Sequence, residues 1–159
     1  MSQKGLANSL KAVIIGVAVC GLVIYFYFLP VWGRAIIRAA PGYERCYIPW
    51  MVFLWITAVP CYLVLLCGWK ISSEIGADRS FSGYNARLLK YISGLAAFDS
   101  VLLFVGSGVF YVLGMSHGGL MLFCIMVVFA GVTVTVAAAA RSHLVYRAAV
   151  LEEESELTI

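Results

Sequence analysis

Residues 119–140 read GLMLFCIMVVFAGVTVTVAAAA, and this stretch contains no charged side chain. A helix needs about 20 apolar residues to cross a hydrocarbon core of roughly 30 Å. The stretch is long enough to cross the bilayer once, and its apolar composition is typical of a membrane-spanning helix. The sequence therefore predicts a transmembrane helix at this position.

Three further stretches of the same kind precede it, at about residues 12–29, 47–69 and 91–115. The chain of 159 residues is 63% hydrophobic and 12% charged, whereas soluble domains carry about a quarter charged residues. We therefore predict an all-α fold, an integral membrane four-helix bundle that forms one domain over residues 1–159 and lies in a cell membrane. A cleaved signal peptide is the alternative for the first stretch. We favour a mature span, because the stretch ends in Phe28-Leu29-Pro30 rather than in a small-x-small cleavage site.

The basic residues predict the orientation of the four spans, because cytoplasmic segments accumulate Lys and Arg. Three segments fall on one side of the membrane: the N-terminal segment, the connection between the second and third spans, and the tail 141–159. They contain eight basic residues, 2 + 4 + 2, namely Lys4, Lys11, Lys70, Arg79, Arg87, Lys90, Arg141 and Arg147. The other side has three, Arg34, Arg38 and Arg45. Eight against three predicts that both termini are cytoplasmic.

The connections between the spans carry their own patterns. Residues 31–46 suit either a short interfacial helix with Arg34 and Arg38 or an extension of the first span, and the sequence leaves both open. Residues 114–119 form a short glycine-rich loop, which predicts an antiparallel hairpin of the last two spans. Ser82 is a predicted N-cap, with Phe81 and Tyr84 expected at the headgroups beside Arg79 and Arg87. The fourth helix is expected to continue into the tail.

Asp99 is the one acidic residue inside an apolar stretch. It lies about 12 Å along a helix from Tyr91, at 1.5 Å per residue, and a charged Asp at the centre of a span costs about 2.5–3.5 kcal/mol. Two alternatives follow. Asp99 either lies deep in the membrane, with Thr57, Thr133 or Thr135 as hydroxyl partners, or it lies near the inner headgroups and has no special role.

Two further features concern the shape and packing of the helices. Pro60 lies near the middle of the second span and cannot donate a hydrogen bond to Ile56, so we expect a kink that serves as a hinge or simply sets the packing. Gly131, Thr135 and Ala139 recur every four residues, and such small side chains let two helices approach closely. The spacing predicts a packing face without deciding whether its partner is internal or a second copy.

The sequence gives no indication of an enzyme. The two histidines, His117 and His143, fall on opposite sides of the membrane, so they cannot share a metal. We find no nucleophile elbow, phosphate-binding glycine loop or metal-ligand spacing, and we expect no catalytic residue, cofactor or nucleic-acid binding. Four of the five cysteines lie in apolar stretches as small hydrophobic residues. Cys46 lies in a connection, where a disulfide between two copies is the alternative to a free thiol.

Three segments together resemble a known family. They are Gly33-Arg34 through Ile56-Thr57-Ala58-Val59-Pro60, then Phe81-Ser82-Gly83-Tyr84-Asn85, and the ending Glu154-Ser155-Glu156-Leu157-Thr158-Ile159. The chain is similar over nearly its whole length to the small bacterial four-span proteins of the domain-of-unknown-function family 2975. That resemblance implies the bacterial cytoplasmic membrane and supplies no catalytic residues. It also implies a cytoplasmic regulator as a partner, since such proteins are often encoded beside a small helix-turn-helix regulator.

The sequence favours a non-enzymatic membrane protein that acts through a partner in signalling or regulation. The acidic tail and the basic inner connection would be its contact surfaces. The alternative is a subunit of a small transporter or channel that works as a homo-oligomer, with Asp99 as its functional residue. A structural or lipid-organising role is a third hypothesis.

Overall fold

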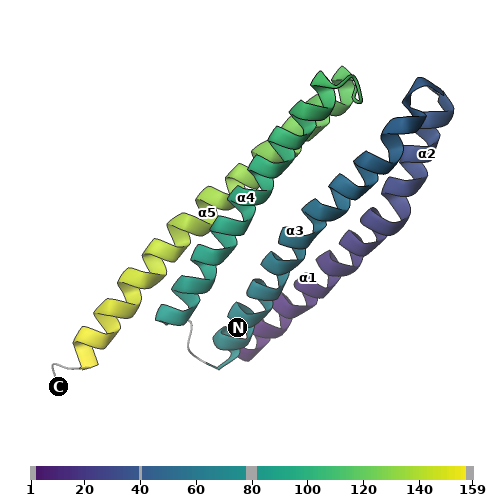
Figure 1. Ribbon diagram of the computed structural model, residues 1–159. Coiled ribbons are helices and arrows are strands. Elements are labelled where there is room, and N and C mark those ends of the chain that lie inside the picture. Colours follow the sequence, from purple (N-terminus) through teal and green to yellow (C-terminus); the bar gives the residue numbers. More distant parts are fainter. Residues whose placement is uncertain (1–2, 40, 78–81, 157–159) are drawn as a thin grey trace.

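The protein is built from long helices, as the computed structural model shows for residues 3–39, 41–77 and 82–156 (Figure 1). The elements are α1 (Gln3–Val23), the π-helical turn η1 (Ile24–Phe28), α2 (Leu29–Ala39), the 3-10 turn η2 (Pro41–Cys46), α3 (Tyr47–Gly76), α4 (Gly83–Val112) and α5 (Gly118–Glu156). Four helical segments are long and apolar enough to cross a membrane: Lys4–Ala39, Gly42–Gly76, Gly83–Val112 and Gly118–Leu151. The predicted all-α, four-span fold is confirmed.

Each long helix packs against the long helix that precedes or follows it in the sequence. α1 contacts α3, α3 contacts α4, and α4 contacts α5, while α1 makes no backbone contact with α4 or α5 among the described residues. The start of α1, the end of α3, the start of α4 and the end of α5 lie at one end of the molecule (Figure 1). The segments predicted to be cytoplasmic therefore share one end, and which end faces the cytoplasm stays a prediction.

The first span extends well beyond its apolar stretch. α1, η1 and α2 form one continuous helical segment up to Ala39, so residues 31–39 extend the first span rather than forming a separate interfacial helix. Pro30 explains the π-turn that joins them. In an α-helix the proline ring would collide with the carbonyl four residues earlier, and a wider turn relieves that collision. Accordingly the Leu29 N–H bonds Ile24 O, five residues back.

Side-chain hydrogen bonds to backbone carbonyls join neighbouring helices. They include Ser72 Oγ to Ala7 O (2.8 Å), Tyr62 Oη to Ala18 O (2.9 Å), Trp55 Nε1 to Tyr25 O (3.5 Å), Ser93 Oγ to Thr135 O (3.0 Å) and Ser142 Oγ to Ala86 O (2.8 Å). Trp50 Nε1 of α3 donates to Met115 O (2.9 Å), in the loop between α4 and α5. Inside a bilayer such bonds are a main source of specificity between helices, because lipid and side chains are equally apolar. These bonds join the first span to α3 and α4 to α5, and the Trp50 bond joins α3 to the loop of the α4–α5 hairpin.

Small residues and aromatic rings fill the contacts between the helices. A Cβ atom at Gly131 of α5 would overlap Ser100 Oγ of α4, and one at Gly106 of α4 would overlap the Phe53 ring of α3. The Phe53 ring also lies 5.4 Å from the Phe110 ring, centroid to centroid. At both positions a methyl group would require the facing side chain to shift.

The ends of the α4–α5 hairpin form as predicted. Ser82 Oγ accepts a hydrogen bond from Asn85 N at 3.2 Å, so Ser82 is the N-cap of α4. Gly114, in the loop before α5, has φ of +69°, a left-handed conformation that favours glycine. The helix after the loop continues to Glu156, as expected. Arg79 and Phe81, predicted at the headgroups, lie outside the described residues.

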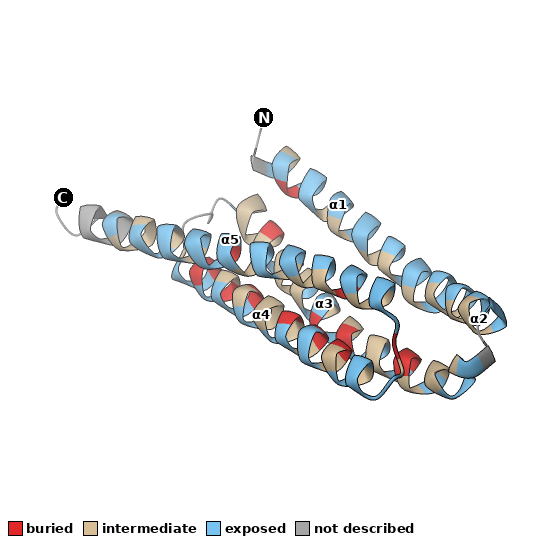
Figure 2. Ribbon diagram, turned by 90° about the horizontal axis from the view of Figure 1, so that it is seen from above, coloured by how far each residue is buried: buried red, intermediate tan, exposed pale blue. Residues whose placement is uncertain are grey.

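Burial is concentrated along α4 and in the parts of α3 and α5 that pack against it (Figure 2). The most deeply buried side chains are polar and small, namely Ser72, Asn85 and Ser107. Large apolar side chains such as Phe26, Phe129 and Val112 are exposed instead. This distribution suits a protein whose outer surface is solvated by hydrocarbon rather than by water.

Candidate intramembrane polar site

Asp99 lies near the middle of α4. It is 16 residues from Gly83 and 13 from Val112, or about 24 Å and 20 Å along the axis. Its partner Cys61 lies in α3 between Trp50 and Trp69, about 16 Å and 12 Å from those two rings by the same rise. Tryptophan rings are enriched at the edges of the hydrocarbon core, so these spacings favour the deep position for Asp99 over the inner headgroups, and its depth in the membrane stays a prediction.

The carboxyl group of Asp99 is only partly satisfied. Cys61 Sγ donates to Asp99 Oδ2 at 3.5 Å, and a thiol is a weak donor. Asp99 Oδ1 is buried and receives no hydrogen bond from any described residue. A carboxyl group with one weak donor and one unpartnered oxygen is poorly stabilised as an anion in a hydrocarbon environment.

A third helix contributes to the same site. The phenol of Tyr25, in the π-turn η1, interacts with the side chains of Thr57 and Cys61 and lies within electrostatic reach of Asp99. Thr57 is buried and donates its own hydroxyl proton to Leu54 O at 2.8 Å. We call Tyr25, Thr57, Cys61 and Asp99 the Asp99 cluster. It joins η1, α3 and α4.

Two prolines weaken the backbone at the same place. The Tyr25 carbonyl has lost its usual donor, because Leu29 N–H bonds Ile24 O and Pro30 has no N–H. Trp55 Nε1 of α3 donates to that carbonyl instead, at 3.5 Å. π-turns of this kind are frequent at functional sites.

Pro60 lies in α3 between two members of the cluster, Thr57 and Cys61. It is buried, and α3 continues through it as one helix to Gly76. Without an N–H, Pro60 leaves Ile56 O without its usual helical donor. Because Pro60 lies inside a continuous helix, the predicted loss of the hydrogen bond to Ile56 O occurs. Whether Pro60 also acts as a hinge stays a prediction.

The cluster can bind and release a proton or a small cation. The four predicted spans contain no Lys or Arg, so Asp99 has no basic residue of its own chain beside it in the hydrocarbon. The acid must then be neutral, or a mobile cation or a group from another molecule must balance its charge. Tyr25 and Cys61 are the titratable neighbours that could exchange a proton with it, and Thr57 adds a further hydroxyl oxygen.

The other predicted partners of Asp99 lie elsewhere. Thr133 and Thr135 donate within α5, to Phe129 O at 2.9 Å and to Gly131 O at 2.9 Å. Gly131 and Thr135 contact α4, which makes this part of the predicted packing face internal. Ala139 is exposed, and Ala138 is the buried residue beside it.

The sequence pattern pointed to Asp99 and Thr57 but missed Tyr25 and Cys61. Tyr25 belongs to a run of aromatic residues that is typical of a membrane interface, and Cys61 is interpreted from the sequence as a small hydrophobic residue. One signal was available for each. Tyr25 lies five residues before Pro30, and Cys61 directly follows Pro60, so both lie where proline disturbs the helix.

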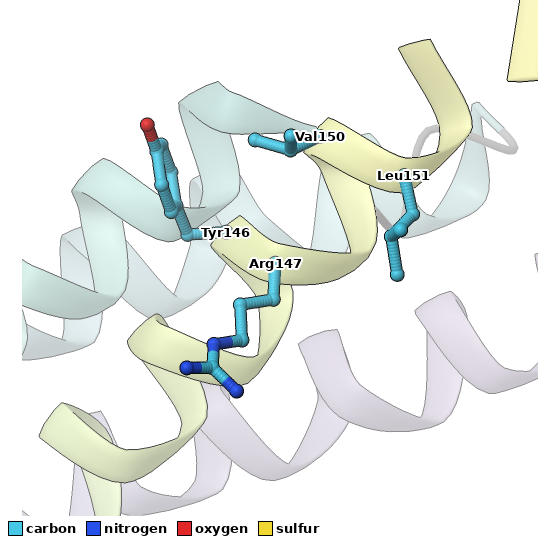
Figure 3. A pocket seen from close by; sticks show the side chains of 4 residues that line it. All are labelled: Tyr146, Arg147, Val150 and Leu151. Atoms are coloured by element: carbon cyan, nitrogen blue, oxygen red, sulfur yellow. The ribbon is translucent and has the colours of Figure 1, made fainter. Parts of the chain in front are cut away.

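A separate hollow lies at the far end of α5 and is lined by Tyr146, Arg147, Val150 and Leu151 (Figure 3). All four side chains come from this single helix, where Arg147 and Leu151 point to one side and Tyr146 to the other (Figure 3). A hollow of this kind cannot enclose a ligand. Among the described residues no group of three or more His, Cys, Asp or Glu side chains could hold a metal ion.

Comparison with known proteins identifies the family. The family described as "Protein of unknown function (DUF2975)" matches residues 32–159. The chain belongs to this family. It is 32% identical over 117 residues to the "Uncharacterized membrane protein YoaS" of Bacillus subtilis (strain 168), an alignment that covers 71% of this chain and 73% of that relative. No solved structure gives a significant match.

Membership confirms the resemblance noted in the sequence. With the four long apolar helices, it establishes a multi-pass membrane protein of a family whose function is unknown. The family match includes Thr57, Cys61 and Asp99 and begins after Tyr25. Three of the four members of the Asp99 cluster therefore lie within the region that defines the family.

Proposed function

We propose that the protein is a non-enzymatic subunit of a small oligomeric transporter or channel, in which the Asp99 cluster exchanges a proton or a small cation. One observation supports this proposal above the others. Asp99 lies about midway along α4, and its Oδ1 atom is buried without a donor among the described residues. Ionisable residues at this depth are rare and commonly belong to ion pathways or proton relays.

The arrangement of the helices supports an oligomer. Because the helices contact one another only in chain order, a single chain does not close around a central space in the part that the structure describes. A pathway lined by Asp99 would then need a neighbouring subunit on the open side. The side chain of Asp99 is only half-buried, which leaves room for such a neighbour or for the transported ion.

The proposal is tested by flux measurements on purified protein in liposomes. Proton uptake is followed with an internal pH-sensitive dye, first with a proton gradient alone and then with an added Na⁺ or K⁺ gradient. We expect Asp99→Asn to reduce the flux at least tenfold, because the amide can neither lose a proton nor balance a cation. Glu44→Gln is the matched control, since Glu44 is an exposed acid in η2, and its flux should equal that of the unmodified protein.

Two results would contradict the proposal. One is that no proton, Na⁺ or K⁺ flux above empty liposomes occurs with the unmodified protein under any gradient. The other is that Asp99→Asn and the unmodified protein give equal fluxes. Circular dichroism in the same liposomes ensures that the compared variants have equal helical content.

Signalling through a cytoplasmic partner is the second candidate, and the length of α5 favours it. α5 has 39 residues, or about 58 Å, well beyond the roughly 30 Å of the hydrocarbon core. Leu144, Tyr146 and Leu151 are exposed on its last turns. Pull-downs with intact protein and with protein truncated after Ser142 test this role, and identical sets of partners would exclude it for the tail.

A further inference from the structure

Three exposed arginines gather at the end of the molecule opposite the two termini. Arg34 and Arg38 lie one turn apart on α2, and Arg45 lies in η2, which contacts α2. Glu44 is the only acidic residue in the chain before Glu74. This end therefore carries an excess of positive charge that its own acidic residues do not neutralise.

The position of α2 decides what its arginines meet. Among the described residues α2 contacts η1, η2 and α3 and no other helix. Gly33 lies against the Tyr47 ring at the start of α3, where a Cβ atom would come within 2.8 Å of that ring. This close contact holds one face of α2 against the protein. Arg34 and Arg38 are exposed on the remainder of the helix surface, which in a bilayer faces lipid.

Aromatic rings set the depth of the two arginines. Trp32 is 60% exposed, and its ring centroid lies 5.6 Å from that of Phe28, one turn nearer the centre of the membrane. Exposed tryptophans prefer the boundary between hydrocarbon and headgroups. Arg34 and Arg38 follow Trp32 by about 3 Å and 9 Å along the helix axis, which places their guanidinium groups among the lipid phosphates.

From this geometry we infer that Arg34 and Arg38 form a binding site for the phosphodiester headgroup of an anionic phospholipid in the leaflet at the α2 end. A guanidinium group donates two parallel hydrogen bonds to a phosphate, and the net charge of an anionic lipid compensates the excess of arginine. Trp32 contacts the upper part of the acyl chains of the same lipid. The site is separate from the Asp99 cluster and does not depend on ion flux.

Quenching of Trp32 fluorescence tests the inference at the site itself. Full-length protein in which Trp32 is the only tryptophan, the other three being replaced by phenylalanine, is reconstituted into vesicles of phosphatidylcholine and phosphatidylglycerol. In each series one of the two lipids carries bromine atoms on its acyl chains near the headgroup. We expect brominated phosphatidylglycerol to quench Trp32 more strongly than brominated phosphatidylcholine at equal mole fraction.

Substitution of the arginines should remove this preference. Arg34→Gln/Arg38→Gln should lower the preference for phosphatidylglycerol by about fivefold for each arginine, which corresponds to about 1 kcal/mol per basic residue near an anionic surface. Arg34→Lys/Arg38→Lys retains the charge without the paired hydrogen bonds and should keep part of the preference. A protein whose only tryptophan is Trp69, at the other end of α3, is the matched reporter and should not respond to the arginine substitutions.

Four outcomes would overturn the inference. Equal quenching by the two lipids in the protein with both arginines would mean that this site has no preference for phosphatidylglycerol. An unchanged preference in Arg34→Gln/Arg38→Gln would mean that the two arginines do not cause it. Absence of quenching by either lipid shows that protein, such as a second copy, covers this face. Loss of the preference on addition of inorganic phosphate, with chloride at equal ionic strength as the control, assigns the site to a soluble anion.

Discussion

The contact between Gly131 and Ser100 provides the sharpest test of the packing between α4 and α5. In Gly131→Ala the new methyl group would overlap Ser100 Oγ, which donates to Ala96 O at 2.8 Å. Forcing an extra methyl group into a packed contact costs about 1–3 kcal/mol. Alanine favours the helix over glycine by up to about 1 kcal/mol. We therefore expect a net destabilisation of about 0–2 kcal/mol.

A matched glycine separates these two effects. Gly108 lies in α4, four residues before its last residue Val112, and a Cβ atom there would meet nothing within 4 Å. Gly108→Ala should therefore show the helix-propensity gain alone. Gly131→Ala should be less stable than Gly108→Ala by about 1–3 kcal/mol, the cost of overpacking. The free energy of unfolding is measured in mixed micelles by titration with a denaturing detergent and followed by circular dichroism.

Removal of the Ser100 hydroxyl should relieve the strain. A Cβ atom at position 131 would lie 3.5 Å from Ser100 Cβ, an ordinary contact. In a double-mutant cycle, Ser100→Ala should therefore recover most of the overpacking cost in the Gly131→Ala background, with a coupling of about 1–2 kcal/mol between the two sites. Equal stabilities of Gly131→Ala and Gly108→Ala, or a coupling near zero, would refute the close approach of α4 and α5 at this point.

Three further substitutions test individual contacts. Pro30→Ala restores the missing N–H, so we expect the π-turn to revert to α-helix and the Trp55 indole to lose its acceptor. Faster hydrogen exchange of the Trp55 indole N–H, measured by NMR, would show this loss. Unchanged exchange would contradict it. Tyr62→Phe removes one of the hydrogen bonds between α1 and α3 and should lower the free energy of unfolding by about 0.6 kcal/mol, the average for such bonds in membranes. Ser142→Ala should cost a similar amount for the pair α4 and α5, and a value near zero in either variant would mean that the bond does not stabilise the fold.

Much of the architecture could be predicted because it depends on residue composition along the chain. Hydropathy and length predict four spans, since a helix must be apolar over about 20 residues to lie in hydrocarbon. The Ser82 cap and the loop at Gly114 are local, because a cap needs a side-chain oxygen and a left-handed turn favours glycine. The end of the first span was left open. The sequence shows Pro30 but not the wider turn by which the helix continues past it.

The amino-acid sequence by itself determined the number of spans, the α4–α5 hairpin, and the presence of one acid, Asp99, in an apolar stretch. The packing of the helices brings Tyr25 and Cys61 beside Asp99, and the depth of Asp99 in the membrane stays a prediction. The physical reason is rotation about the helix axes. A membrane helix is apolar on all sides, so its sequence predicts that it crosses the bilayer but not which face meets its neighbour. Contacts such as that of Gly131 with Ser100 set those rotations.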